Sequence, residues 1–215
     1  MFDDEFPIPP QKELDLYPWR HPAQWTVWAD RVIGGVNQPL THLLPFDMEL
    51  SRDAKGTLPA LVVPIKVIFD CHVVTEKDAT VNPVDVAEDE RYWIDSGRCA
   101  RLFHPDRHQL SLALPEMIKG LTNGKTKCYG AQKNNYMVWR PLGVDRGAPH
   151  YQVFFDIYRP STSTSRLVMY VQSAYVKDEP LSVQRQNERV FATVCAGLMG
   201  VIPMKHKGPR NKARK

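Results

Sequence analysis

Two histidines of this chain stand four residues apart in the segment HPDRHQL, at His104 and His108. At this spacing two imidazoles can share one helix face, where they could bind a metal ion or transfer protons. Pro105 suits the first turn of a helix, so we expect His104 at the N-cap, turned away from His108. No HExxH glutamate stands between them. We therefore predict no metal ion and no cofactor, and we weigh a capping or surface role against general acid/base catalysis by His104 or His108.

A second candidate site follows from the alternation of side chains along the segments YQVFFDIYR and RLVMYVQSAYV. One of the two faces of this strand pair must point to the core, and we expect it to be the face that buries the most aliphatic surface. That face carries Val153, Phe155, Ile157, Leu167, Met169 and Val171. The opposite face then carries aromatic, basic and polar side chains, and the preceding strand adds two more if Met137 and Trp139 point inward. These candidates are Tyr136, Arg140, Asp156, Tyr158, Arg166, Tyr170 and Gln172.

Such a face could bind single-stranded nucleic acid, because tyrosine rings stack on bases and arginines neutralise phosphates. The alternative is a solvated or helix-covered sheet face, in which tyrosine occurs for its β propensity. Asp70 and His72, on one side of a predicted strand, could form a titratable pair, although buried polar residues of strands more often satisfy the neighbouring backbone. The sequence contains no phosphate-binding loop, GxSxG elbow, dinucleotide fingerprint or CxxC pair.

These residues must be positioned by several strands and one helical segment. The β-branched run of residues 58–76 is typical of a long buried strand. Apolar residues of 104–124 recur at helical spacing, which Pro115 must kink or split. The remaining segments predict an antiparallel meander over residues 127–132, 135–140, 151–159, 166–176 and 189–201. We therefore predict an α+β fold, in which an antiparallel sheet meander packs against one main, kinked helix and an irregular N-terminal arm rich in tryptophan and proline.

The length of 215 residues suits one domain. We expect residues 1–55 to form the arm packed on the body, residues 56–203 the single α+β domain, and residues 204–215 a disordered basic tail. The tail holds six of the 28 basic residues, so the rest of the chain has 22 basic against 24 acidic residues. Nucleic-acid binding by charge is therefore expected from local clusters or from the tail, with Lys205, Lys207 and Arg210 as candidates.

The chain has no apolar run long enough to span a membrane, and its start, MFDDEFPIPP, is acidic, unlike a signal peptide. We therefore expect a cytoplasmic protein that makes no contact with a membrane. The four cysteines are widely spaced and are expected to be reduced. The oligomeric state does not follow from the sequence.

The series FDCHVV, LFHPDRHQLSLALPEMIKGL, YQVFFDIYRP and LVMYVQSAYVKD resembles an uncharacterised bacterial family of plasmids and integrative elements, some of whose members are labelled stationary-phase growth adaptation proteins. The resemblance covers about residues 60 to 200 and implies no activity. At the level of fold alone, a helix followed by an antiparallel meander also resembles the small metal-independent ribonucleases of bacterial toxin systems. No catalytic residue of those enzymes can be placed on this sequence by a motif.

The leading hypothesis is an accessory protein of a mobile element that interacts with nucleic acid, RNA in the first place, and that could cleave RNA without a metal ion. The alternative is a protein-interaction module, such as an inhibitor, an adaptor or a stress-response partner. It would bind through the tryptophan arm, with Trp25 and Trp28, or through a sheet edge. A third hypothesis is a metal-dependent hydrolase that uses His104, His108 and a carboxylate.

Overall fold

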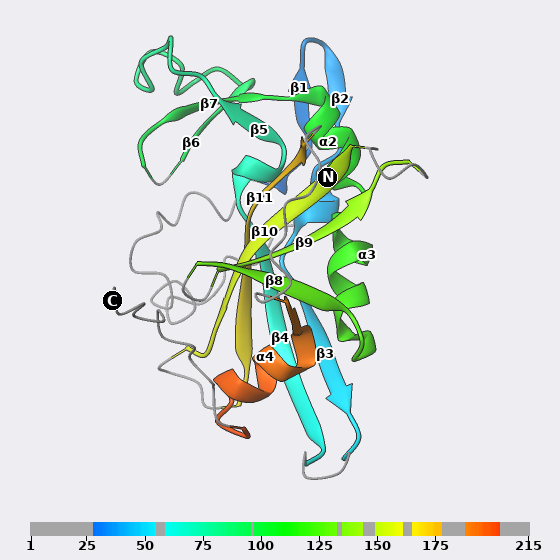
Figure 1. Ribbon diagram of the computed structural model, residues 1–215. Coiled ribbons are helices and arrows are strands. Elements are labelled where there is room, and N and C mark those ends of the chain that lie inside the picture. Colours follow the sequence, from blue (N-terminus) through cyan, green and yellow to red (C-terminus); the bar gives the residue numbers. More distant parts are fainter. Residues whose placement is uncertain are drawn as a thin grey trace, which may run out of the picture.

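A seven-stranded sheet that curls into an open half-barrel forms the body of the protein (Figure 1). The computed structural model describes residues 28–54, 59–95, 97–132, 135–143, 149–160, 165–177 and 188–202. In sheet order the strands are β12 (Glu188–Val190), β8 (Lys127–Gln132), β9 (Asn135–Pro141), β10 (His150–Tyr158), β11 (Leu167–Lys177), β4 (Leu61–Phe69) and β3 (Phe46–Arg52). All neighbours are antiparallel except β11 and β4, which run parallel.

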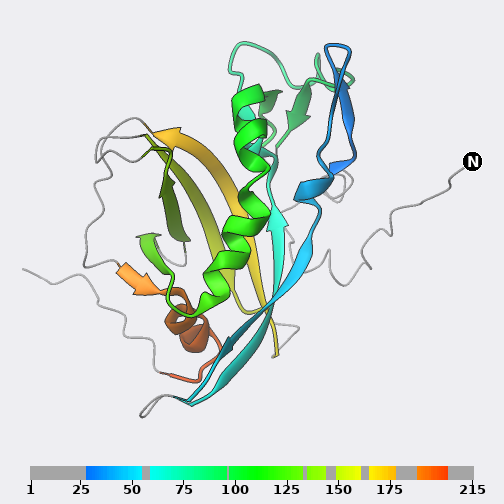
Figure 2. The ribbon, with the colours of Figure 1, turned by 90° about the vertical axis from the view of Figure 1, so that its right-hand side faces the viewer.

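Short helices cover the concave side of this sheet. Figure 2 shows α2 (Pro105–Ser111) and α3 (Leu114–Lys119) end to end across the concave side, with α4 (Phe191–Leu198) at the lower end. The helices contribute apolar side chains to one core with the strands. The Phe191 ring of α4, for example, meets the Phe155 ring of β10 at a centroid distance of 6.2 Å.

Two smaller sheets lie at the upper end of the half-barrel in Figure 1. One is a three-stranded sheet of β5 (Thr75–Lys77), β7 (Ala100–Phe103) and β6 (Tyr92–Ile94), and the other is the hairpin of β1 (Arg31–Ile33) and β2 (Val36–Gln38). Gly34 and Gly35 form the hairpin turn at φ of 60° and 78°, a region that favours glycine. Single 3₁₀ turns complete the described elements: η2 (Thr41–Leu43), η3 (Cys71–Val73), which joins β4 to β5, and η4 (Gly120–Asn123).

The predicted fold, a meander on one main helix with an irregular arm, is wrong. Strand β4 enters the sheet parallel to β11, and residues 46–52 of the predicted arm form β3, which pairs with β4 along its whole length. A pattern of alternating residues identifies a strand but not its partner, so these long-range pairings could not be read from the sequence. Trp28, also of the predicted arm, is buried in the core, whereas Trp25 lies outside the described residues.

Two segments also differ in type or length from the prediction. Residues 189–201, predicted as a strand, form the short β12 and then α4, five of whose eight residues are buried. Apart from Arg189 and Thr193 their sequence is apolar, and such a run does not distinguish a buried strand from a buried helix. The main helix is split in two, because Pro115 lies in the first turn of α3, where its missing N–H costs nothing.

The predicted core face of the β10 and β11 pair is confirmed. All six residues are fully buried on the concave side: Val153, Phe155, Ile157, Leu167, Met169 and Val171. No helix in the described ranges is both long and apolar enough to cross a lipid bilayer.

The neighbouring valines of β4 offer a matched test of this burial, because Val63 is fully buried and Val62 is 61% exposed. We expect Val63→Ala to lower the free energy of unfolding by about 2–3 kcal/mol, from lost apolar burial and the cavity that remains. Val62→Ala should cost less than about 1 kcal/mol. Urea denaturation of both variants measures the difference, and equal losses would contradict the assigned faces of β4.

Candidate functional site

The predicted tyrosine and arginine face is divided between the two sides of the sheet. Part of it forms a small cluster on the convex side, opposite the main core: Ile68, Val168, Tyr170 and the partly buried Tyr158. Tyr170 is only 5% exposed, and Gln172 donates a hydrogen bond of 2.6 Å from Nε2 to Asp156 Oδ2. These side chains pack against one another, so Tyr170 offers no open ring for a base.

Strand β9 turns Tyr136 and Arg140 to the concave side. Tyr136 pairs with Phe155 in the register and stacks on its ring at a centroid distance of 6.0 Å. Trp139 therefore points to the convex side, so the assumption that Met137 and Trp139 face inward was wrong. Arg166 precedes β11 at the end of the sheet opposite Arg140, and the predicted residues are not brought together.

The two histidines of α2 also separate. His104 is the N-cap of α2 and accepts a hydrogen bond from the Arg107 amide at Nδ1, 3.4 Å away, as the position of Pro105 predicts. His108 is buried and donates from Nε2 to the Pro39 carbonyl at 2.8 Å. His104 therefore borders solvent and Glu76, 3.8 Å from its Nε2, while His108 belongs to the interior.

His108 lies in a polar network that sequence reasoning missed. The His42 ring meets the His108 ring at 5.8 Å, and His42 Nε2 lies 2.8 Å from Ser111 Oγ. Because the Ser111 hydroxyl donates to the His108 carbonyl, His42 must donate its Nε2 proton to Ser111. Burial, and then the neighbouring His108, lower the pKa of His42 to about 4.

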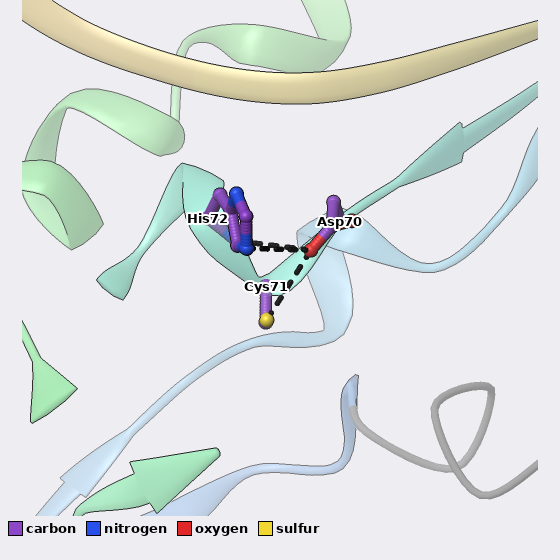
Figure 3. Close-up of side chains that lie close together, drawn as sticks. All are labelled: Asp70, Cys71 and His72. Atoms are coloured by element: carbon purple, nitrogen blue, oxygen red, sulfur yellow. Dashed lines mark hydrogen bonds and ion pairs between the residues drawn. The ribbon is translucent and has the colours of Figure 1, made fainter. Parts of the chain in front are cut away.

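A second group of titratable side chains gathers where β4 ends. The backbone is extended at Asp70 and turns into η3, so that Asp70, Cys71 and His72 converge (Figure 3). His72 Nε2 lies 3.8 Å from Asp70 Oδ1 and 3.1 Å from Oδ2 of Asp95, which follows β6. The titratable pair Asp70 and His72 is thus present, but a 3₁₀ turn forms it rather than a longer strand, and the fold adds Asp95.

Fixed hydrogen bonds hold this group in place. The Thr75 hydroxyl donates to the Cys71 carbonyl at 2.8 Å, and Arg101 binds Thr75 through Nε at 3.0 Å. Asp95 Oδ1 accepts the Cys99 amide at 2.9 Å, which turns Oδ2 toward His72. Arg101 Nη1 is 3.7 Å from the same Oδ2 and compensates its charge.

Cys71 has no nucleophilic character in this setting. Burial, and then the Asp70 carboxylate, raise the pKa of the Cys71 thiol well above its ordinary value. The thiol donates to Asp70 Oδ1 at 3.2 Å. Burial likewise raises the pKa of Cys128 to about 12, and that of Cys195 further still. These thiols stay protonated near neutral pH, and all four cysteines are free.

Arg107 and Arg140 border the hydroxyl of Tyr151 at the upper end of the sheet. The Arg140 guanidinium carbon is 5.9 Å from the Tyr151 ring, and the charges of both arginines act against the effect of burial, which raises the pKa of Tyr151. Arg107 donates from Nη1 to the carbonyls of His72, at 3.3 Å, and Thr75, and its guanidinium carbon is 5.9 Å from the Tyr175 ring. No carboxylate in the described ranges lies within 4.0 Å of the nitrogens of either arginine.

Sequence reasoning named Arg140, His104 and the pair Asp70 and His72 but not Arg107 or Asp95. Arg107 stands between His104 and His108 in the sequence, which was a signal that it could belong to the same site. The sequence does not show, however, that its side chain reaches the residues that follow β4. The tail candidates Lys205, Lys207 and Arg210 lie outside the described residues.

The lowered pKa of His42 predicts how stability depends on pH. Because the folded pKa, about 4, is below the ordinary value of 6.5, protonation favours the unfolded chain. The contribution of neutral His42 is complete above pH 6.5 and is lost as the pH falls through about 4. We expect urea midpoints at pH 7, 5.5 and 4 to fall less for His42→Gln than for the wild-type protein. An equal decrease of the urea midpoint in both proteins would contradict the assignment of this pH dependence to His42.

Comparison with known proteins gives a family but no activity. No curated protein and no solved structure matches the chain. The association with mobile elements and with stationary-phase growth adaptation therefore stays a prediction. The sequence model of the YjaZ family, however, matches residues 30–199, most of the 215-residue chain. This protein belongs to the YjaZ family.

Proposed function

We propose that this protein binds single-stranded nucleic acid, RNA in the first place, through a cationic patch formed by Arg107, Arg140 and Tyr175. The observation that carries the proposal is the pair of arginines, Arg107 in the first turn of α2 and Arg140 near the end of β9, with no carboxylate of the described residues within 4.0 Å of either. Such unneutralised guanidinium groups favour an anion, and phosphate suits their planar donors. The resemblance to mobile-element proteins suggests an accessory role in such an element.

Arg107 supports phosphate binding because its charge is already partly desolvated. Burial, and then the neighbouring Arg101, lower its pKa, while Glu76 has a smaller opposing effect. Only Nη1 has a hydrogen-bond partner among the described residues, so Nε and Nη2 remain available. A bound phosphate would therefore meet a guanidinium group whose position is fixed by two backbone carbonyls, which limits the entropy lost on binding.

Tyr175 gives this patch a surface for a base. Its ring stacks on Phe154 at a centroid distance of 5.4 Å and an angle of 18°, and both rings are partly exposed. Stacked aromatic rings beside arginine are the usual means of binding single strands without sequence preference. The cationic patch thus retains Arg140 from the predicted face and replaces its buried tyrosines by Tyr175. Arg140 leaves β9 on the concave side and Tyr175 leaves β11 on the convex side, so an RNA strand that contacts both must pass over the end of the sheet, beside Arg107.

The salt dependence of binding tests the patch. Each phosphate contact with a single strand contributes about 0.7 to the slope of log K against log salt. We expect Arg107→Gln/Arg140→Gln to weaken binding of a labelled RNA 20-mer and to reduce the slope by about 1.4, measured by fluorescence anisotropy at several salt concentrations. The basic tail should account for much of the remaining slope.

Arg91→Gln is the matched control, because Arg91 is an exposed arginine that is already paired with Asp89 at 2.6 Å. It removes one positive charge but should leave the slope unchanged. If the control lowers the slope as much per charge as the double variant, net charge rather than the patch determines binding. Absence of binding at low salt would instead favour the protein-interaction module.

The same proposal includes cleavage of bound RNA without a metal ion, with His104 as the proton donor. Because Nδ1 of His104 accepts the Arg107 amide, its exchangeable proton is on Nε2, 3.8 Å from Glu76 Oε2. Glu76 could take the proton of the RNA 2′-hydroxyl as that oxygen attacks phosphorus. His104 would donate its Nε2 proton to the departing 5′-oxygen, which gives a 2′,3′-cyclic phosphate and a 5′-hydroxyl. The proton taken by Glu76 would then return to Nε2 of His104, which restores both groups. His108 is buried and is not assigned this role.

Cleavage of end-labelled RNA, with and without EDTA, tests this reaction. The wild-type protein should cleave equally in both, and a DNA of the same sequence should stay intact because it lacks the 2′-hydroxyl. His104→Gln should slow cleavage by about 10²- to 10⁴-fold, with circular dichroism confirming that the variant folds. Loss of cleavage in EDTA, or an unchanged rate in His104→Gln, would refute the assigned chemistry.

A further inference from the structure

We propose that Asp70, Cys71 and His72 bind a divalent ion of the zinc type at the end of β4. The three side chains supply an oxygen, a sulfur and a nitrogen donor, all within 4.8 Å of one another. Carboxylate, thiolate and imidazole are the donors that Zn²⁺ takes in proteins. None of the three proposed ligands belongs to the proposed RNA contact, although Arg107 donates a hydrogen bond to the His72 carbonyl.

Two of the three separations between donor atoms are close to those of a tetrahedral zinc site. Zinc bonds of about 2.0–2.3 Å at tetrahedral angles place neighbouring donors roughly 3.3–3.7 Å apart. Asp70 Oδ1 lies 3.2 Å from Cys71 Sγ and 3.8 Å from His72 Nε2. Figure 3 shows the sulfur and the imidazole nitrogen both directed at the same carboxylate oxygen. The sulfur and imidazole donors lie within 4.8 Å of each other, so these two side chains must approach by roughly 1 Å to complete the three bonds.

Asp95 defines the fourth position. Its Oδ2 lies 3.1 Å from His72 Nε2, and its Oδ1 is bound by the Cys99 amide. When His72 Nε2 binds the ion, Asp95 loses this partner and can accept a hydrogen bond from a water on the ion. Three protein ligands and a water are the arrangement of an open zinc site, and the partly exposed His72 gives the ion a path from solvent.

The charges of this group also suit a dication. Binding of the ion would release the proton of the Cys71 thiol to solvent, and the thiolate that results would neutralise Zn²⁺ together with the Asp70 carboxylate. Arg101, 3.7 Å from Asp95, compensates the remaining carboxylate. The Thr75 hydroxyl holds the Cys71 carbonyl at 2.8 Å, so the turn that carries the ligands is fixed before the ion arrives. Fixed ligands of suitable charge distinguish this group from an ordinary surface ion pair.

The test is metal content and spectroscopy of the full chain. After incubation with zinc and dialysis, elemental analysis should find one equivalent in the wild-type protein, whose melting temperature should rise by several degrees with zinc. Cobalt substitution should give a near-ultraviolet charge-transfer absorption from the Cys71 thiolate. Cys71→Ser should lose this absorption, and His72→Gln should lose stoichiometric binding. Circular dichroism would establish that each variant folds, with Asp70→Asn as a replacement if one does not.

Cys99→Ser is the matched control, because Cys99 is the partly exposed thiol nearest in sequence to Asp95 and is not among the proposed ligands. It should keep both the absorption and the zinc content, as should Arg140→Gln, which alters the proposed RNA contact at a residue that does not belong to the ion site. A wild-type protein without stoichiometric zinc would overturn the proposal. So would Cys71→Ser and His72→Gln variants that bind zinc and cobalt like the wild-type protein.

Discussion

The parallel pairing of β11 with β4 is the constraint on which the candidate site depends. Parallel strands end at the same edge of a sheet, so the turn after β4 lies beside the last residues of β11. The Asp70 amide extends the ladder by donating to the Val171 carbonyl at 2.9 Å. This pairing brings η3 to the end of the sheet at which Tyr175 stacks on Phe154. The first turn of α2 places Arg107 at the same end.

The packing of the concave side holds this edge in place. Two helices and the curled sheet share one core, so α2 cannot move relative to β10 and β11 without exposing the apolar residues of α3. Polar groups at the boundary are fixed in the same way, as the hydrogen bond of buried His108 to the Pro39 carbonyl illustrates. The orientation of Arg107 is therefore set by the core as much as by its own hydrogen bonds.

Two groups of side chains with opposite charge preferences lie next to each other at this end of the sheet. Toward β9 and β11 the side chains are cationic and aromatic, and the environment favours phosphate and bases. Toward η3 and the turn after β6 they are carboxylates, a thiol and an imidazole, which favour a cation. Arg101 lies between the two, because it compensates Asp95 and also acts on the pKa of Arg107. Membership of the YjaZ family assigns an activity to neither group.

The sequence by itself determined the strands of the β10 and β11 pair, their buried face, the N-cap at His104 and the break in the helix near Pro115. Each follows from local periodicity or from the backbone of proline, which do not depend on distant residues. Only the tertiary structure decided that residues 189–201 are largely helical, that β4 joins β11, and that Arg107, Arg140, Asp95 and His72 lie at the same end of the sheet. Apolar runs without a period, and contacts between residues far apart in the chain, depend on how the whole core packs.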